Sequence, residues 1–400
     1  MVERLVANEK VEGSTPFARS KPEKMLKICI EGWRGINHSY SIINQNQLIE
    51  LSKLPIDLRF RDVSFPDKNW NNNKNADGFS KDDKRIVNQI QKAKTDEIFD
   101  VIYRISYPFD LAKTKSKKHF VQITSERNTK LNIINGSPSD LSNRQYLKII
   151  TPSIWSKNGL IKTGFDENQI IIIPHGVNNK IFRKISENEL NNLKLKLNIK
   201  KDDFVLTNVS AMTGNKGIHF LITAYAILKQ KLKNLKLILK DQSGLYNIKA
   251  QTYIKTIQDT KYSKFMTDDV LKDIIFISEN LDLKTLNQLY NLSNCYVSPY
   301  KSEGFNLPPL EAAAAGTPII VTKGGSTDDY FTSEIGLQVE SNLIETEDKR
   351  FLEPNLDSLI DCITEVYNNT KNFGQIEGSK MIQNNYSWTK ITRKLYEAIK

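Results

Sequence analysis

The chain has little cysteine and little histidine for its length. Its 400 residues include 3 cysteines and 4 histidines. Cys29, Cys295 and Cys362 lie far apart without a C-x-x-C pair, and each stands in an apolar run, so we expect small core residues. The histidines are scattered and form no Cys/His cluster, which argues against a zinc site. This usage excludes a disulfide-stapled fold and agrees with a cytoplasmic protein.

Long apolar runs are missing as well. No stretch approaches the roughly 20 consecutive apolar residues that a membrane-spanning helix needs. The first residues, MVERLVANEKVEGSTPFARSKPEK, lack the apolar segment of a secretory signal. We therefore expect residues 1–24 to be an unstructured extension, Met25 to be the functional start, and the protein to be cytoplasmic.

Acidic residues are outnumbered by basic ones. Lysine and arginine number 57 against 46 aspartates and glutamates, a formal net charge of +11. The basic residues are spread along the chain, with modest clusters at residues 113–118 and 184–201. No finger, RNP or helix-turn-helix pattern accompanies them, so we expect no nucleic-acid partner. A solvated surface explains such diffuse charge, and an anionic lipid surface or phosphorylated ligand is the alternative.

What the chain does have is a repeated alternation of strand and helix patterns. Residues 26–31, 100–106 and 119–124 show the apolar pattern of buried strands. From residue 204 onward the alternation is regular, with helically spaced apolar residues over 217–233. Such alternation predicts an α/β fold with mostly parallel sheets. We expect two Rossmann-like domains, residues 25–167 and 168–380, that face a cleft where ligands bind beyond the carboxyl ends of the strands.

The most informative stretch is SEGFNLPPLEAAAAGTP, residues 302–318. A strand pattern at residues 295–299 precedes it. Pro308 and Pro309 suit the first turn of a helix, where a missing amide costs nothing, and Gly316 suits the position just after its end. The spacing therefore predicts a short helix that begins directly after a loop at the carboxyl end of a strand.

Two carboxylates flank this predicted loop. Residues 304–307 would lie at a helix N-terminus, whose amides bind anions, and Gly304 would let the backbone approach a ligand closely. Glu311 would lie about one turn inside the helix, within reach of a ligand hydroxyl. The alternatives are that Glu311 only complements the helix dipole and that Glu303 is a solvated loop carboxylate.

The segment SEGFNLPPLEAAAAGTPIIVTKGG resembles the E-x7-E donor-site signature of the GT-B retaining glycosyltransferases of family 4, the glycosyl transferases group 1. Other segments fall in the order that this family shows: IIIPHGVNNKIF, VSAMTGNKGIHFLITAYAIL, LNQLYNLSNCYVSPYKSEGF and NYSWTKITRKLYEAIK. The last is similar to a terminal helix that crosses back to the N-terminal domain, here residues 381–400. The match is good over residues 170–400 and looser over 25–165.

The resemblance implies a donor site in the second domain. Glu303 would hold hydroxyls of the donor sugar, Glu311 the ribose hydroxyls, and Lys216 the departing pyrophosphate. Backbone amides of one loop would assist: Gly304, Phe305, Asn306 and Leu307. The family usually has an arginine five positions before the lysine, and Ala211 stands there instead. Compensating groups would come from nearby polar residues: Thr213, Asn215 or Lys240.

The resemblance also implies partners from the first domain. Gly35, in the turn after the first strand, would approach the donor phosphates, with an ordinary turn as the alternative. His38 is a third candidate catalytic residue beside Lys216 and Glu303, with a purely structural histidine as the alternative. Arg104 and Glu126 end two strands that face the expected cleft and would position an acceptor hydroxyl.

The implied reaction transfers a hexose from a UDP- or GDP-linked donor to an acceptor hydroxyl with retention, in the synthesis of cell-surface glycans. No D-x-D motif occurs, so we expect metal independence and no cofactor besides the nucleotide-sugar substrate. The expected acceptor is a glycan or a lipid-linked sugar, and residues 113–118 are the best local candidate for peripheral contact with the anionic inner face of a membrane. The alternatives are a GT-B-like sugar-nucleotide epimerase and a non-catalytic binder of glycans or lipid surfaces.

Overall fold

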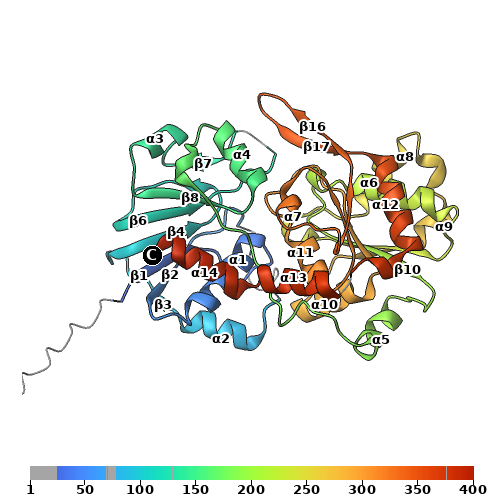
Figure 1. Ribbon diagram of the computed structural model, residues 1–400, viewed down its shortest axis with the longest axis horizontal. Helices are drawn as coiled ribbons and strands as arrows, with labels where there is room; N and C mark the ends of the chain where they lie inside the picture. The colour runs from blue at the N-terminus through green and yellow to red at the C-terminus, as the bar shows by residue number, and fades with distance from the viewer. Residues whose placement is uncertain (1–24, 69, 71–77, 128–129, 375) are drawn as a thin grey trace, which may run out of the picture.

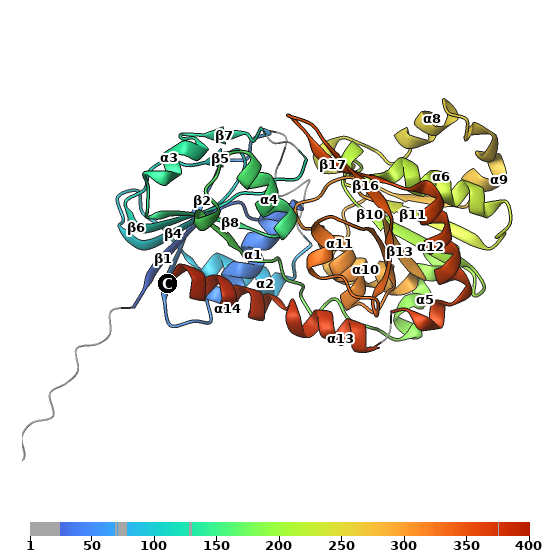
Figure 2. The ribbon, with the colours of Figure 1, turned by 45° about the horizontal axis from the view of Figure 1, so that its top comes forward.

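The computed structural model describes residues 25–400 except 69, 71–77, 128–129 and 375 (Figure 1). The unstructured extension that we expect at residues 1–24 lies outside this part. The described chain folds into two α/β domains that lie side by side, and the last two helices run along both of them in both views (Figures 1 and 2). The predicted fold class is confirmed.

The N-terminal domain is built on a seven-stranded sheet in the order β3-β2-β1-β4-β6-β8-β9. All neighbouring strands pair in parallel. The strands are β1 (Lys27–Gly32), β2 (Asp57–Asp62), β3 (Gln91–Lys92), β4 (Phe99–Ile105), β6 (Ser116–Gln122), β8 (Leu147–Thr151) and β9 (Ile170–Ile172). The helices are α1 (Ser39–Leu51), α2 (Lys81–Gln89), α3 (Pro138–Ser142) and α4 (Ile154–Lys162), and a small two-stranded sheet joins β5 (Phe109–Asp110) to β7 (Ile133–Ile134).

The strand β9 extends the first sheet past the boundary near residue 167 that we predicted. Ile170 pairs with Ile149 of β8, in parallel with it. The first sheet therefore ends at Ile172, and the boundary falls too early. The apolar pattern shows that a strand is present, but it carries no information on which of two sheets accepts its hydrogen bonds.

The C-terminal domain has a second parallel sheet in the order β12-β11-β10-β13-β14-β15. Its strands are β10 (Phe204–Val209), β11 (Leu235–Lys240), β12 (Ile274–Ile277), β13 (Cys295–Ser298), β14 (Ile319–Thr322) and β15 (Gly336–Val339). The helices are α5 (Glu187–Lys196), α6 (Ile218–Lys229), α7 (Ser243–Tyr246), α8 (Thr252–Gln258), α9 (Asp268–Leu271), α10 (Leu283–Leu292), α11 (Leu307–Ala314) and α12 (Leu356–Asn368). Short 3₁₀ turns cover Glu167–Gln169, Gly214–Lys216, Ser263–Phe265, Ser326–Asp329 and Thr370–Asn372.

Outside this sheet, β16 (Ser341–Glu345) and β17 (Arg350–Pro354) form an antiparallel hairpin. It leaves the domain after β15 and returns before α12. In both views the hairpin projects from the C-terminal domain toward the N-terminal domain (Figures 1 and 2).

The chain ends with α13 (Ile376–Asn385) and α14 (Trp388–Ile399), which bring it back to the first domain. The apolar residues Ile391 and Leu395 of α14 are buried, and the helix packs on α1. Thr389 donates a hydrogen bond to Glu50 of α1 at 3.0 Å. The predicted crossover of the terminal helix is confirmed. No helix in the described part of the chain is both long and apolar enough to cross a membrane.

Candidate active site

A cleft of about 650 Å³ lies between the two domains. Residues that follow β4 and β6 line it from the N-terminal domain, and residues that follow β10, β11 and β13 line it from the C-terminal domain. Both parallel sheets therefore present the carboxyl ends of their strands to the cleft, which is where α/β folds bind ligands.

The loop after β13 turns into α11 as the sequence predicts. Pro308 and Pro309 occupy the first turn of the helix, and Gly316 follows its end with a left-handed φ of 81°. Asn306, the residue that precedes the helix, also has a positive φ, 68°. Its side chain donates a hydrogen bond to Ser298 at 3.0 Å, which fixes this turn against the end of β13. The N-terminus of α11 thus opens on the cleft, with Gly304, Phe305, Asn306 and Leu307 in the lining.

At Gly304 the two domains lie in close contact. A Cβ atom on Gly304 would lie 2.0 Å from Cγ2 of Thr124, which belongs to the N-terminal domain. The hydroxyl of Ser153 donates a hydrogen bond to the carbonyl of Gly304 at 2.6 Å. Because Gly304 has no side chain, the two domains can pack closely here and the backbone remains accessible from the cleft.

Lys216 and Glu303 form an ion pair inside the cleft. Burial by itself would lower the pKa of Lys216, but the carboxylates of Glu303 and Glu126 outweigh it and raise that pKa above its ordinary value. Lys216 is therefore a fixed cation at neutral pH, although the side chain is largely withdrawn from solvent. The pair places one positive charge beside the N-terminus of α11, where further anionic groups bind favourably.

Thr213 and Asn215 hold the lysine loop against the loop after β13. Thr213 donates a hydrogen bond to the Asn215 side chain at 2.6 Å. The Asn215 amide donates to the carbonyl of Ser302 at 2.9 Å, and the amide of Lys301 donates to the carbonyl of Asn215 at 2.7 Å. Both residues line the cleft, yet these contacts also give them a bracing role that sequence reasoning did not foresee.

Glu126 faces the same group from the N-terminal domain. Its Oε2 lies 3.4 Å from the amide nitrogen of Asn215, which donates to it. The side chain is exposed to the cleft, and residues of both domains line the cleft around its carboxyl group. This surrounding protein, together with the nearby Glu303 carboxylate, raises the pKa of Glu126 to about 7, with Lys216 opposing the shift. The structure therefore joins a predicted acceptor-side residue to the predicted donor-side pair.

Glu311 lies one turn into α11, where the sequence places it, and also lines the cleft. Its Oε2 accepts a hydrogen bond from the hydroxyl of Tyr290 at 3.0 Å. Burial raises the pKa of Glu311 to about 8, with the Tyr290 hydrogen bond opposing the shift. A carboxyl group in this condition can both accept from and donate to the hydroxyls of a ligand.

Lys240 and Ala211 lie next to each other at the ends of neighbouring strands. Lys240 ends β11 opposite Val209 of β10, and Ala211 follows two residues later, with both Lys240 and Ala211 in the lining of the cleft. Nζ of Lys240 donates to the carbonyl of Asp241. Burial lowers the pKa of Lys240 to about 8, with Asp241 and Glu279 opposing the shift. A second amine is thus present beside the position where the family has its arginine.

His38 lies at the start of α1, in contact with several aromatic rings. Its Nδ1 accepts a hydrogen bond from the amide of Tyr40 at 3.1 Å, so the proton of the neutral ring is on Nε2. Burial and the charge of Lys216 lower the pKa of His38 to about 4, which keeps the ring neutral. Its ring centre lies 5.0 Å from that of Trp33 and 5.2 Å from that of Trp70. His38 therefore caps a helix and at the same time lines the cleft.

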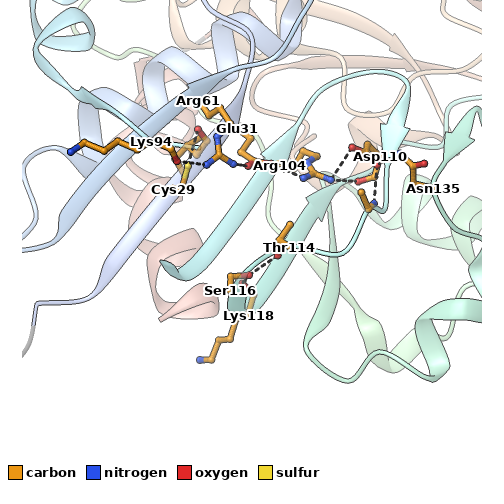
Figure 3. Close-up of polar contacts among 12 residues, drawn as sticks. Cys29, Glu31, Arg61, Lys94, Arg104, Asp110, Thr114, Ser116, Lys118 and Asn135 are labelled. Carbon is orange, nitrogen blue, oxygen red and sulfur yellow. Dashed lines mark hydrogen bonds and ion pairs between the residues drawn. The ribbon is translucent and has the colours of Figure 1, made fainter. Parts of the chain in front are cut away.

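Two predicted site residues do not reach the cleft. Arg104 ends in a buried ion-pair network, with Nη2 at 2.7 Å from Glu31 and Nη1 at 3.1 Å from Asp110 (Figure 3). Glu31 stands opposite Arg104 on the neighbouring strand β1 and also pairs with Arg61. The prediction that Arg104 positions an acceptor is therefore wrong, because the Glu31 carboxylate on the adjacent strand binds the Arg104 guanidinium. Gly35 has a left-handed φ of 79° in the turn after β1 but is not part of the lining.

Sequence reasoning missed several residues that line the cleft. They come from loops of both domains: Asn37, Tyr107, Arg127, Asn132, Gln242 and Tyr246. Gln242 stands two residues after the end of β11, so the rule that ligands lie beyond strand ends could have found it. In the described part of the chain, no group of three or more His, Cys, Asp or Glu side chains is arranged to hold a metal ion.

Comparison with known proteins finds a matching family model for most of the second domain. Residues 191–372 match the family model of glycosyl transferases group 1. The chain is 31% identical over 179 residues to the capsular polysaccharide biosynthesis glycosyltransferase CapM of Staphylococcus aureus. The aligned region covers 44% of this chain and 43% of CapM. It spans about two fifths of the length of the first curated relatives that it matches, at 43% and 40%.

Solved structures are similar over nearly the whole chain. A glycosyltransferase from Rickettsia africae has a TM-score of 0.65 at 14% identity, and the similarity covers 93% of this chain and 97% of that one. The Anabaena protein HepE, solved with UDP and glucose, has a TM-score of 0.62 at 14% identity, over 93% of this chain and 99% of HepE. At such low identity these likenesses show the fold. The chain therefore has the two-domain GT-B fold, and residues 191–372 of its C-terminal domain match the model of the glycosyl transferases group 1 family.

Proposed function

We propose that this protein transfers a hexose from a nucleoside-diphosphate sugar to an acceptor hydroxyl, with retention at the anomeric carbon, in the synthesis of cell-surface glycans. The observation that carries the proposal is the Lys216–Glu303 ion pair at the N-terminus of α11, with Glu126 facing it across the cleft. CapM of S. aureus, by its name a capsular polysaccharide glycosyltransferase, supports the assignment to glycan synthesis.

In this proposal the C-terminal domain holds the donor. Lys216 neutralises the diphosphate, Glu303 accepts hydrogen bonds from hydroxyls of the sugar, and Glu311 contacts the ribose. Lys240 supplies the second cation beside Ala211, and amides of the loop that precedes α11 face the diphosphate. A donor that is placed in this way needs little further activation, because positioning and a preorganised positive field lower the barrier.

The reaction exchanges one bond for another at the anomeric carbon. The bond from this carbon to the diphosphate oxygen breaks, and a bond to the acceptor oxygen forms on the same face. The acceptor proton passes to the departing phosphate oxygen. Lys216 stabilises the charge that develops on this oxygen, and His38 and Glu126 contact the sugar or the acceptor from the N-terminal domain.

The direct test is a screen of nucleotide sugars for thermal stabilisation of the protein, with free UDP and free GDP as controls. We expect one UDP- or GDP-linked hexose to raise the unfolding midpoint, because a ligand that binds only the folded state stabilises it by mass action. The absence of stabilisation by any nucleotide sugar or free nucleotide would contradict the proposal. Incubation of the stabilising donor without acceptor separates a transferase from an epimerase, which alone would convert the sugar.

We also propose that transfer needs no metal ion, since Lys216, Lys240 and the N-terminus of α11 supply positive potential for the diphosphate. Transfer should then continue in EDTA at an unchanged rate. Loss of transfer in EDTA that Mg²⁺ or Mn²⁺ restores would disprove this part. The anomeric configuration of the product, read by proton NMR, tests retention.

A glycan or lipid-linked acceptor met at an anionic membrane face remains part of the proposal, supported by the net charge of +11. In the basic segment 113–118, Lys115 and Lys117 pair with Asp96 and Asp100, and Lys118 donates to the terminal carbonyl at Lys400. Binding to anionic vesicles that salt reverses would support contact with the membrane. No binding at low salt would refute it.

A further inference from the structure

The β16–β17 hairpin is anchored at its base on the loop that carries the candidate donor site. The amide of Leu352 donates to the carbonyl of Lys301 at 2.6 Å, and the Leu352 side chain is buried. Lys301 also forms an ion pair with Glu353 of the hairpin. Because Lys301 is bonded in turn to the backbone of Asn215, the hairpin is continuous with the Lys216 and Glu303 loops.

The other end of the hairpin reaches the N-terminal domain through Arg350. The backbone amide of Arg350 donates to the carbonyl of Arg127 at 2.7 Å. Its guanidinium lies over the indole of Trp155 at 3.6 Å and donates to the carbonyl of Trp155 at 2.9 Å. Only a planar guanidinium can stack on a ring and donate within its own plane at the same time.

Trp155 passes this contact on to Glu126. The indole Nε1–H donates to the backbone carbonyl of Glu126 at 2.9 Å, and Trp155 itself is buried. Two consecutive carbonyls are therefore held: Arg350 binds that of Arg127 directly, and Trp155, on which Arg350 stacks, binds that of Glu126. The carboxyl group of Glu126 extends from this doubly held backbone into the cleft, toward Asn215.

We propose that Arg350 is a positioning residue, which acts through Trp155 and the Arg127 carbonyl to hold Glu126 opposite Lys216 and Glu303. The hairpin then forms a bridge by which one domain sets the place of a side chain in the other. That Glu126 serves sugar transfer rests on the proposed function, but the positioning itself does not.

The titration of Glu126 offers a readout of its position that requires no ligand. Four charged or titratable groups face its carboxyl group: Lys216, Glu303, Tyr40 and Tyr246. Of these, neither tyrosine titrates near neutral pH, because burial raises the pKa of each well above its ordinary value. The surrounding protein and the Glu303 carboxylate raise the pKa of Glu126 to about 7, so this pKa should fall when the carboxyl group moves away from both.

The experiment uses the full chain with ¹⁵N-labelled tryptophan, which gives indole signals from four tryptophans. W155F assigns the Trp155 signal, and its shift is followed from pH 5 to 9. In the wild type we expect a titration with a midpoint near 7, which E126Q abolishes. In R350A we expect the Trp155 signal to move and the midpoint to fall toward the ordinary value of a glutamate, since the carboxyl group moves away from the surrounding protein and from Glu303.

The matched control is K349A, which removes one exposed cation next to Arg350 at the tip of the hairpin and should keep the wild-type midpoint. A wild-type midpoint in R350A, or an equal shift in K349A, would overturn the proposal. The signals of Trp33 and Trp388 report on the fold of each variant. If R350A does not fold, R350K replaces it with the same two outcomes, because lysine keeps the charge but loses the planar stacking.

This result is separate from the fate of the proposed function. A shifted midpoint in R350A, together with no stabilisation by any nucleotide sugar, would keep the positioning role and reject the sugar donor. An unshifted midpoint in R350A together with clear donor binding would reject the positioning role of Arg350 and keep the proposed sugar donor.

Discussion

Replacing Gly304 with alanine tests whether ligand binding at the loop before α11 needs the close contact between the two domains. The added Cβ would lie 2.0 Å from Cγ2 of Thr124, whereas carbon atoms in contact are normally about 3.5–4.0 Å apart. The domains must therefore separate by roughly 1.5 Å at this point, or the loop or the Thr124 side chain must move. Since Gly304 has no positive φ, the effect comes from the contact alone.

Overpacking of this kind costs about 1–3 kcal/mol, which corresponds to a roughly 5- to 150-fold loss of the closed arrangement. The structure also offers a specific rescue. Thr124→Ser deletes only Cγ2, and the next atoms near the new Cβ, Thr124 Cβ at 3.5 Å and Glu126 Cγ at 3.6 Å, are at ordinary contact distance. The double variant G304A/T124S should therefore recover the closed arrangement.

Small-angle X-ray scattering and the affinity for the donor found in the nucleotide-sugar screen measure these effects. G304A should enlarge the radius of gyration and weaken donor binding, T124S alone should do neither, and the double variant should behave like the wild type. If G304A matches the wild type, or if T124S fails to rescue it, the close contact between the domains does not control the site.

Two further predictions concern buried charge. Glu311 has a pKa of about 8 in the fold and an ordinary value near 4.5 when unfolded, so it stabilises the fold fully below pH 4.5 and loses this contribution as the pH rises to 8. Denaturant unfolding should therefore show E311Q gaining stability relative to the wild type over this range, and a constant difference would refute the pKa shift. R104M should lower the free energy of unfolding by about 3 kcal/mol, because it leaves Glu31 with Arg61 as its ion-pair partner. The affinity for the donor should stay unchanged. Weaker donor binding by a folded R104M variant would show that Arg104 does belong to the binding site.

How much of the site the sequence can predict depends on whether a local backbone pattern or a general rule of parallel sheets determines a residue's neighbours. The helix α11 was predictable because Pro308, Pro309 and Gly316 act on the backbone locally. The approach of Lys216 to Glu303 was predictable because both follow neighbouring parallel strands at the same edge of one sheet.

Residues whose partners depend on strand register or on the packing of the two domains were not predictable in the same way. Arg104 lies near the end of β4 and Glu126 in the loop after β6, but only the register between β1 and β4 shows that Glu31 binds Arg104. The contact of Gly304 with Thr124 and the stacking of Arg350 on Trp155 join the two domains, so no local pattern contains them. The same reason explains why β9 lies in the first sheet although we expect the second domain to begin at residue 168.

The central claim is that Lys216 and Glu303 bind and activate a nucleoside-diphosphate sugar. Its most direct test is the rate of nucleotide release from the stabilising donor, measured for the wild type, K216A, E303Q and the surface control K323A. We predict that K216A and E303Q each lose about 10²–10³-fold in turnover while they stay folded, as for other groups that stabilise developing charge, and that K323A keeps the wild-type rate. Nucleotide release that survives both K216A and E303Q would contradict the account.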